Sequence, residues 1–113
     1  MESILTSIKK LLGPTETYDN FDTDIIQHIN STFAELTQLG VGPPEGYYIE
    51  DADNTWDEFL TDPVQLGMAK DYVYISCKLV FDPPTNASVL QSLEKRLSKL
   101  EWRLNVDAET NKD

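Results

Sequence analysis

The amino-acid sequence predicts an all-α fold: a small bundle of about four to five helices around one central, buried helix. Apolar residues recur at three- and four-residue steps in several separate segments, which is the spacing of one helix face. Helix-capping residues precede these segments, and glycine or proline follows them. The 113 residues suffice for one hydrophobic core but not for two. We therefore expect one domain over residues 1–106 and a polar, flexible tail over residues 107–113.

Two amphipathic helices are predicted in the first third of the chain. The first is short, ends at Gly13–Pro14, and has these apolar positions at helical spacing: Ile4, Leu5, Ile8, Leu11 and Leu12. The second runs from about Thr23 to Leu39, with Asp22 or Thr23 as its cap and Gly40 as its left-handed stop. Its apolar residues fall on about a third of its circumference, so each helix has one buried face.

A long connection, residues 40–55, follows the second helix and is rich in turn-forming residues. Loops of this length inside a compact domain are usually functional or disordered. Tyr47, Tyr48 and Ile49 could form a short extended segment within it. Thr55 and Glu58 then have the spacing of a capping box, which predicts a helix of one to two turns over "TWDEFL".

The central helix is predicted from Pro63 to about Phe81, with Asp62 as its cap. It carries two apolar stripes on opposite sides: Leu66, Ala69, Val73, Cys77 and Val80 form one, and Val64, Met68, Tyr72, Ile75 and Leu79 form the other. A helix that is apolar on two faces is buried between neighbours. The β-branched and aromatic residues of "YVYISCKLVF" would also suit a strand. The cap and the doubled helical spacing favour the helix.

A last helix is predicted after Pro83 and Pro84, which end the central one. Asn86 or Ser88 begins it, with Ser88 and Gln91 offering a capping box. Its leucines recur at alternating steps of three and four: Leu90, Leu93, Leu97, Leu100 and Leu104. Two heptads are too short to establish a coiled coil. Antiparallel packing on the central helix explains the same leucines.

The charge is distributed unevenly along the chain. The formal net charge is −11, and all nine Lys and Arg residues lie outside residues 13–63, which hold twelve of the twenty acidic residues. Such a segment repels a phosphate backbone, so direct DNA binding is not expected. Three uses remain open: a surface past which DNA moves without sticking, a mimic of DNA, or a face that keeps the protein soluble.

Catalytic and metal-binding patterns find little support, so we expect neither an enzyme nor a cofactor. The only histidine, His28, could pair with Asp24 one turn away, and the only cysteine, Cys77, falls on a buried stripe. A calcium-loop spacing is imitated by Asp51, Asp53, Thr55, Asp57 and Asp62, but Trp56 stands where that loop needs glycine. No signal peptide or membrane span is apparent, which predicts a soluble protein that is intracellular when made.

Aromatic residues provide the candidate interaction sites. Trp102 lies nearly opposite the leucine stripe of the last helix, beside Lys95, and indole is strongly favoured at interfaces. Tyr47, Tyr48 and Trp56 lie in or beside the long connection, residues 40–55, which is acidic. Two interpretations stay open for these three rings: they cover the small core, or they contact a neighbouring molecule.

Several segments resemble the small head–tail connector proteins of long-tailed phages and Gram-positive prophages, also called adaptor or head-completion proteins. These segments are "TSIKKLLG", "FDTDIIQHINSTFAELTQLGVGP", "TWDEF" and "KLVFDPP…LEKRLSKLEWRLN". They extend from Thr6 to about Val106 in the same order as in that family. The family has no short catalytic signature, so the resemblance assigns no site residue.

The resemblance implies a helical bundle whose copies form a ring, usually twelvefold, beneath the portal of the phage head. The implied partners are the portal protein, the stopper or tail-completion proteins and further copies of the chain. DNA would pass through the ring without specific binding, and no membrane is involved. The implied location is the head–tail junction of the virion, after synthesis in the bacterial cytoplasm. The alternative left open by the charge is a small acidic DNA mimic or regulator that binds a DNA-binding protein.

Overall fold

The structure, a computed structural model, describes residues 2–13 and 22–110 and confirms the all-α prediction. Within these residues the chain forms five helices and no strand: α1 (Ile4–Leu12), α2 (Asp22–Gln38), α3 (Trp56–Phe59), α4 (Pro63–Phe81) and α5 (Ala87–Thr110). A single antiparallel bridge joins Ser3 to Thr55. The bridge holds the residue before α1 against the residue before α3, although the two are far apart in sequence.

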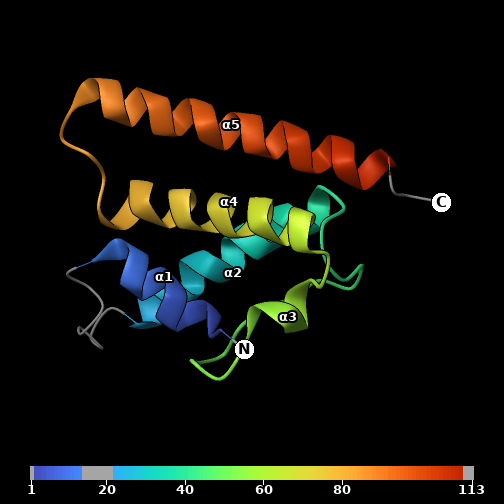
Figure 1. Ribbon diagram of the computed structural model, residues 1–113. Coiled ribbons are helices and arrows are strands. Elements are labelled where there is room, and N and C mark those ends of the chain that lie inside the picture. The colour runs from blue at the N-terminus through green and yellow to red at the C-terminus, as the bar shows by residue number, and fades with distance from the viewer. Residues whose placement is uncertain (1, 14–21, 111–113) are drawn as a thin grey trace.

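The helices form three layers with α4 in the middle (Figure 1). Helix α5 runs antiparallel to α4 along one side, and α1 and α2 pack against the other side. Helix α3 lies on the side of α4 away from α5, whereas the start of the loop that precedes it reaches the end of α5. The predicted central helix is therefore confirmed, and most of the hydrophobic core lies between α4 and the α1–α2 layer.

Helix α4 begins and ends as its sequence predicts. The side chain of Asp62 accepts hydrogen bonds from the backbone N–H groups of Val64 and Gln65, at 3.0 and 3.3 Å. Pro63 occupies the first turn, where a missing N–H costs nothing. Five α4 side chains are buried among the neighbouring helices: Ala69, Tyr72, Val73, Ile75 and Cys77. Both apolar stripes contribute to this set, and only their outermost residues, such as Val64 and Val80, are exposed.

The junction between α2 and the long loop is a Schellman motif. The Val41 N–H donates to the Leu36 carbonyl at 2.9 Å, and the Gly40 N–H donates to the Thr37 carbonyl at 3.0 Å. Gly40 has a φ of 87°, which confirms the predicted left-handed stop. At the other end, the predicted cap is corrected. Asp22 and Thr23 both lie inside α2, and the position before them falls outside the described residues.

The long loop folds back on α2, and its described residues form no strand. The Ile49 N–H donates to Asn30 Oδ1 at 2.7 Å, and Asn30 Nδ2 donates to the Ile49 carbonyl at 3.0 Å. One side-chain amide therefore satisfies both backbone groups of Ile49, as a neighbouring strand would. This leaves the Ile49 side chain fully buried in the core.

Helix α5 begins at its predicted cap but extends further than expected. Asn86 Oδ1 accepts from the N–H groups of Ser88 and Val89, at 2.8 and 3.2 Å. Ser88 is therefore the second residue of the helix, which corrects the alternative start and its capping box with Gln91. Leu100 and Leu104 are buried, as the antiparallel packing requires.

The end of α5 corrects the predicted boundary at residue 107. The helix continues to Thr110, so the first four residues of the predicted tail are helical. Gln65 Nε2 of α4 donates to Asp107 Oδ2 at 3.0 Å, which fixes this last stretch to the start of the central helix. Residues 111–113 lie outside the described residues.

Candidate interaction surfaces

Trp56, one of the predicted interface residues, belongs to the core. Only 3% of its surface is exposed, and its indole N–H donates to Ser7 Oγ of α1 at 2.9 Å. The ammonium of Lys70 lies 5.6 Å from the centre of the ring, within the range of a cation–π interaction. Trp56 thus connects α1, α3 and α4 within one protomer.

Tyr47 also covers the core, although its edge reaches solvent. Its ring meets Phe33 edge-on, with 5.3 Å between centroids, and lies 5.6 Å from the ring of Phe59. Its hydroxyl donates to Glu58 Oε1 at 2.9 Å. Burial and the neighbouring Glu58 carboxylate raise the pKa of Tyr47 above its ordinary value. For Tyr47 and Trp56, the structure therefore supports the interpretation that loop rings cover the core.

Trp102, Tyr48 and Lys95 remain on the surface. Trp102 is 66% exposed and Tyr48 is 64% exposed, and no hydrogen bond or ring contact within the described residues involves either side chain. Trp102 borders a shallow hollow of about 280 Å³ that is lined by Leu39, Ser98, Glu101, Trp102 and Asn105. A large ring exposed beside a hollow suits contact with another molecule, because burying it there would remove apolar surface from water.

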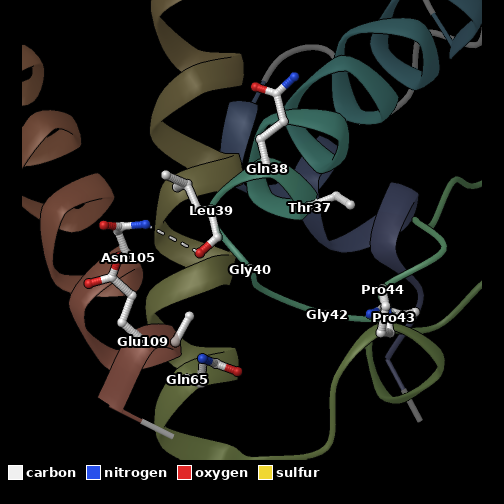
Figure 2. A pocket seen from close by; sticks show the side chains of 11 residues that line it. Thr37, Gln38, Leu39, Gly40, Gly42, Pro43, Pro44, Gln65, Asn105 and Glu109 are labelled. Atoms are coloured by element: carbon white, nitrogen blue, oxygen red, sulfur yellow. Dashed lines mark hydrogen bonds between the residues drawn. The ribbon is translucent and has the colours of Figure 1, made fainter. Parts of the chain in front are cut away.

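A larger cavity, which no sequence pattern indicated, opens at the end of the bundle (Figure 2). It has a volume of about 570 Å³, and its walls come from the end of α2, the following loop, the start of α4 and the end of α5. Asn105 Nδ2 donates to the Leu39 carbonyl at 3.4 Å across its rim. Leu39 and Asn105 also line the hollow beside Trp102, so the two depressions share one edge.

The described residues that line the cavity include few groups that could take part in catalysis. Glu109 is its only ionisable side chain, and the other polar groups are the amides of Gln38, Gln65 and Asn105 and the hydroxyl of Thr37. A lone carboxylate provides no paired general acid and base and no nucleophile with an adjacent base. The described lining of the cavity therefore contains no catalytic pair of that kind.

His28 and Cys77 have structural environments. His28 Nε2 lies 2.9 Å from Ser76 Oγ of α4, and the His28 ring packs edge-on against Phe81. The predicted pair with Asp24 is therefore replaced by a contact between α2 and α4. Burial raises the pKa of the Cys77 thiol to about 12, so the thiolate is scarce at neutral pH.

The acidic loop is organised by turns and caps. Asp51 Oδ1 accepts from the Asp53 N–H at 2.8 Å, and Glu58 Oε1 accepts from the Thr55 N–H at 3.3 Å at the start of α3. Among the residues that the structure describes, no group of three or more His, Cys, Asp or Glu side chains could hold a metal ion. None of the described helices has the length and apolar content that a membrane crossing requires.

Comparison with known proteins gives one match. A family model described as "Phage connector protein" matches residues 4–111, a range that includes all five helices. No curated protein and no solved structure shows significant similarity to the chain.

Proposed function

Because the chain belongs to the phage connector protein family, we propose that it is a structural virion protein that joins the portal of the phage head to the tail. The observation that carries this proposal is the extent of the family match, which includes every helix of the bundle. The chemistry of the surface is consistent with it. The described surface exposes the rings of Trp102 and Tyr48 and a hollow beside Trp102, and exposed aromatic rings suit contacts between proteins.

The proposed partners are the portal protein, the stopper or tail-completion proteins and other copies of the chain. In a ring, each subunit binds the next one head to tail, so it contacts its two neighbours through two different surfaces. The ring closes when the rotation between successive subunits adds up to a full turn. Trp102 on α5 and Tyr48 in the loop offer exposed aromatic groups at two separate places. We propose a ring, twelvefold in line with the family resemblance, at the head–tail junction of the virion.

The charge supports a passive role toward DNA. A ring built from subunits with a net charge of −11 would give DNA few cations to bind. DNA could then move through the channel without being held. A DNA mimic would instead need carboxylates spaced along an extended face. In this chain, seven of the twenty acidic residues lie within residues 45–62. No feature of the described residues favours that alternative over the connector.

Electron microscopy of portal complexes tests the proposal directly. Portal particles from the same phage are imaged alone and after addition of the full chain. We expect an added symmetric ring on the tail side of the portal only when the chain is present. A phage lacking the gene should accumulate filled heads that lose DNA or fail to join tails. Normal infectious particles from that deletion phage would overturn the proposal.

A further inference from the structure

The outward face of α5 presents a basic and aromatic surface that no other described helix covers. We define the α5 face by five residues: Lys95, Lys99, Trp102, Arg103 and Val106. Each is three or four residues from another member, so all five lie on one side of the helix. All five are exposed. The leucines that pack toward the core, Leu93, Leu97, Leu100 and Leu104, fall on the opposite side of the helix by its geometry.

The three cations of the α5 face have no ion-pair partner in the described chain, although α5 also holds four acidic residues. Lys95, Lys99 and Arg103 follow one another at four-residue steps, and none forms an ion pair with another described residue. Arg96, one residue away, does pair with Asp71 of α4, at 3.1 Å. Like charges at this spacing repel one another along a helix. An acidic partner would relieve that repulsion.

The acidic loop has the complementary character. We use this name for residues 45–62, which contain no Lys or Arg and these seven acidic residues: Glu45, Glu50, Asp51, Asp53, Asp57, Glu58 and Asp62. Tyr48, with 64% of its surface exposed, lies within it. The loop is held in place by its own turns and by the core packing of Tyr47 and Ile49.

Most of the acidic loop lies away from the α5 face within one protomer. Helix α5 forms one outer layer of the molecule and α3 lies on the other side of α4 (Figure 1), although the start of the loop after α2 reaches the end of α5 near Asn105. No ion pair joins the α5 face to the acidic loop among the described residues, so their charges are available for a contact between molecules. A contact that joins one face to a different face on the next copy is heterologous, and repetition of it with a suitable rotation closes a ring.

We propose that the α5 face binds the acidic loop of a second copy of this chain. The inference rests on the proposed connector function and names the surfaces that hold the ring together. Trp102 serves as the aromatic anchor, and Tyr48 of the next copy is the exposed ring that can pack beside it. The surrounding lysine, arginine and carboxylate side chains fix the register of the contact and speed its formation.

Cross-linking between isotope-labelled chains tests the contact. Equal amounts of unlabelled and fully ¹⁵N-labelled chain are mixed at high protein concentration and low salt, both alone and with portal particles. A carbodiimide then couples amines to carboxylates that touch. Mass spectrometry should find mixed-isotope peptides that join Lys95 or Lys99 to acids of residues 45–62. Absence of such peptides from both samples, or amine links to other segments only, would overturn the proposal.

Charge reversal provides the matched variants. Lys99→Glu should reduce the yield of these cross-links at the remaining Lys95 on the order of tenfold, since a carboxylate would then face the acidic loop. The helix itself should tolerate the change, because the introduced carboxylate lies one turn from both Lys95 and Arg103 and can pair with them. Lys10 is exposed on α1, so Lys10→Glu alters the net charge equally and should leave the yield unchanged. Equal losses in both variants would show that only net charge matters and would overturn the specific contact.

A compensating change completes the test. Asp53 has an exposed carboxylate, and only its backbone N–H takes part in the turn, so Asp53→Lys preserves the loop. We expect a mixture of Lys99→Glu and Asp53→Lys chains to associate better than either variant alone. A portal ring that persists with Lys99→Glu would overturn the α5 contact and keep the connector function. Absence of a ring with the unmodified chain would overturn the function itself.

Discussion

The two tryptophans of this chain lie in opposite environments. The indole N–H of Trp56 has a hydrogen-bond partner in Ser7, and its ring is enclosed by α1 and α4. The ring of Trp102 extends from α5 into solvent. The same side chain is therefore a core residue at one position and an exposed contact group at the other.

Alanine substitutions should separate these two roles. Trp56→Ala should lower the free energy of unfolding by about 3–5 kcal/mol, because it leaves a cavity and removes the partner of Ser7. Trp102→Ala should change it by no more than about 0.5 kcal/mol and should weaken association with the portal or with other copies. Urea unfolding measures the first quantity, and co-sedimentation with portal particles measures the second. A strongly destabilised Trp102→Ala protein would show that this ring is part of the core.

The exposure of Trp102 could be predicted from sequence, whereas the burial of Trp56 could not. Five leucines fix which side of α5 faces α4, and the angle of Trp102 from them follows from helix geometry alone. The environment of Trp56 depends on Ser7, 49 residues earlier in the chain. No local pattern encodes such a contact, so sequence alone leaves both interpretations of the loop rings open.

The elements follow their capping residues closely. Asp62, Asn86 and Gly40 mark helix ends at the positions that their side chains or backbone conformations require. The long loop is harder to predict, because its conformation depends on the Asn30 amide and on packing under Phe59. The cavity at the end of the bundle escapes prediction for the same reason: three stretches far apart in the sequence build it.

Two glycines provide a matched test of how the loop is fixed. Gly42 has a φ of 85°, and a Cβ placed there would lie 2.4 Å from Phe59 Cε1. Gly42→Ala should therefore cost about 1–3 kcal/mol through its backbone conformation alone, and more through the clash. Gly67 lies inside α4 with open space around it, so Gly67→Ala should stabilise the protein by about 0.5–1 kcal/mol.

Chemical unfolding of both variants checks this prediction. The two substitutions add the same methyl group, so opposite changes in unfolding midpoint would isolate the effect of the site. An unchanged midpoint for Gly42→Ala would mean that the loop does not pack on Phe59 as described. A destabilised Gly67→Ala would contradict the open helical position.

At the scale of the whole molecule, the order of helices places α5, with Lys95, Lys99 and Arg103, and α3, with Asp57 and Glu58, on opposite sides of α4 (Figure 1). The sequence already shows that residues 13–63 lack Lys and Arg. It does not show that α3 and the basic residues of α5 lie on opposite sides of α4, because that depends on how the helices stack. Charge composition argues against DNA binding, and the layered arrangement adds a surface suited to a second copy.

DNA is the main alternative partner for the α5 face, since Lys95, Lys99 and Arg103 could also contact phosphates. We expect no retardation of duplex DNA by micromolar protein in about 50 mM salt. Three phosphate contacts release few counterions, and the net charge of −11 opposes the approach of DNA. A retarded band that weakens with added salt, and disappears in a Lys95→Ala, Lys99→Ala variant, would assign this face to DNA. An unretarded duplex, together with cross-links from Lys95 or Lys99 to the acidic loop, would assign it to the neighbouring subunit.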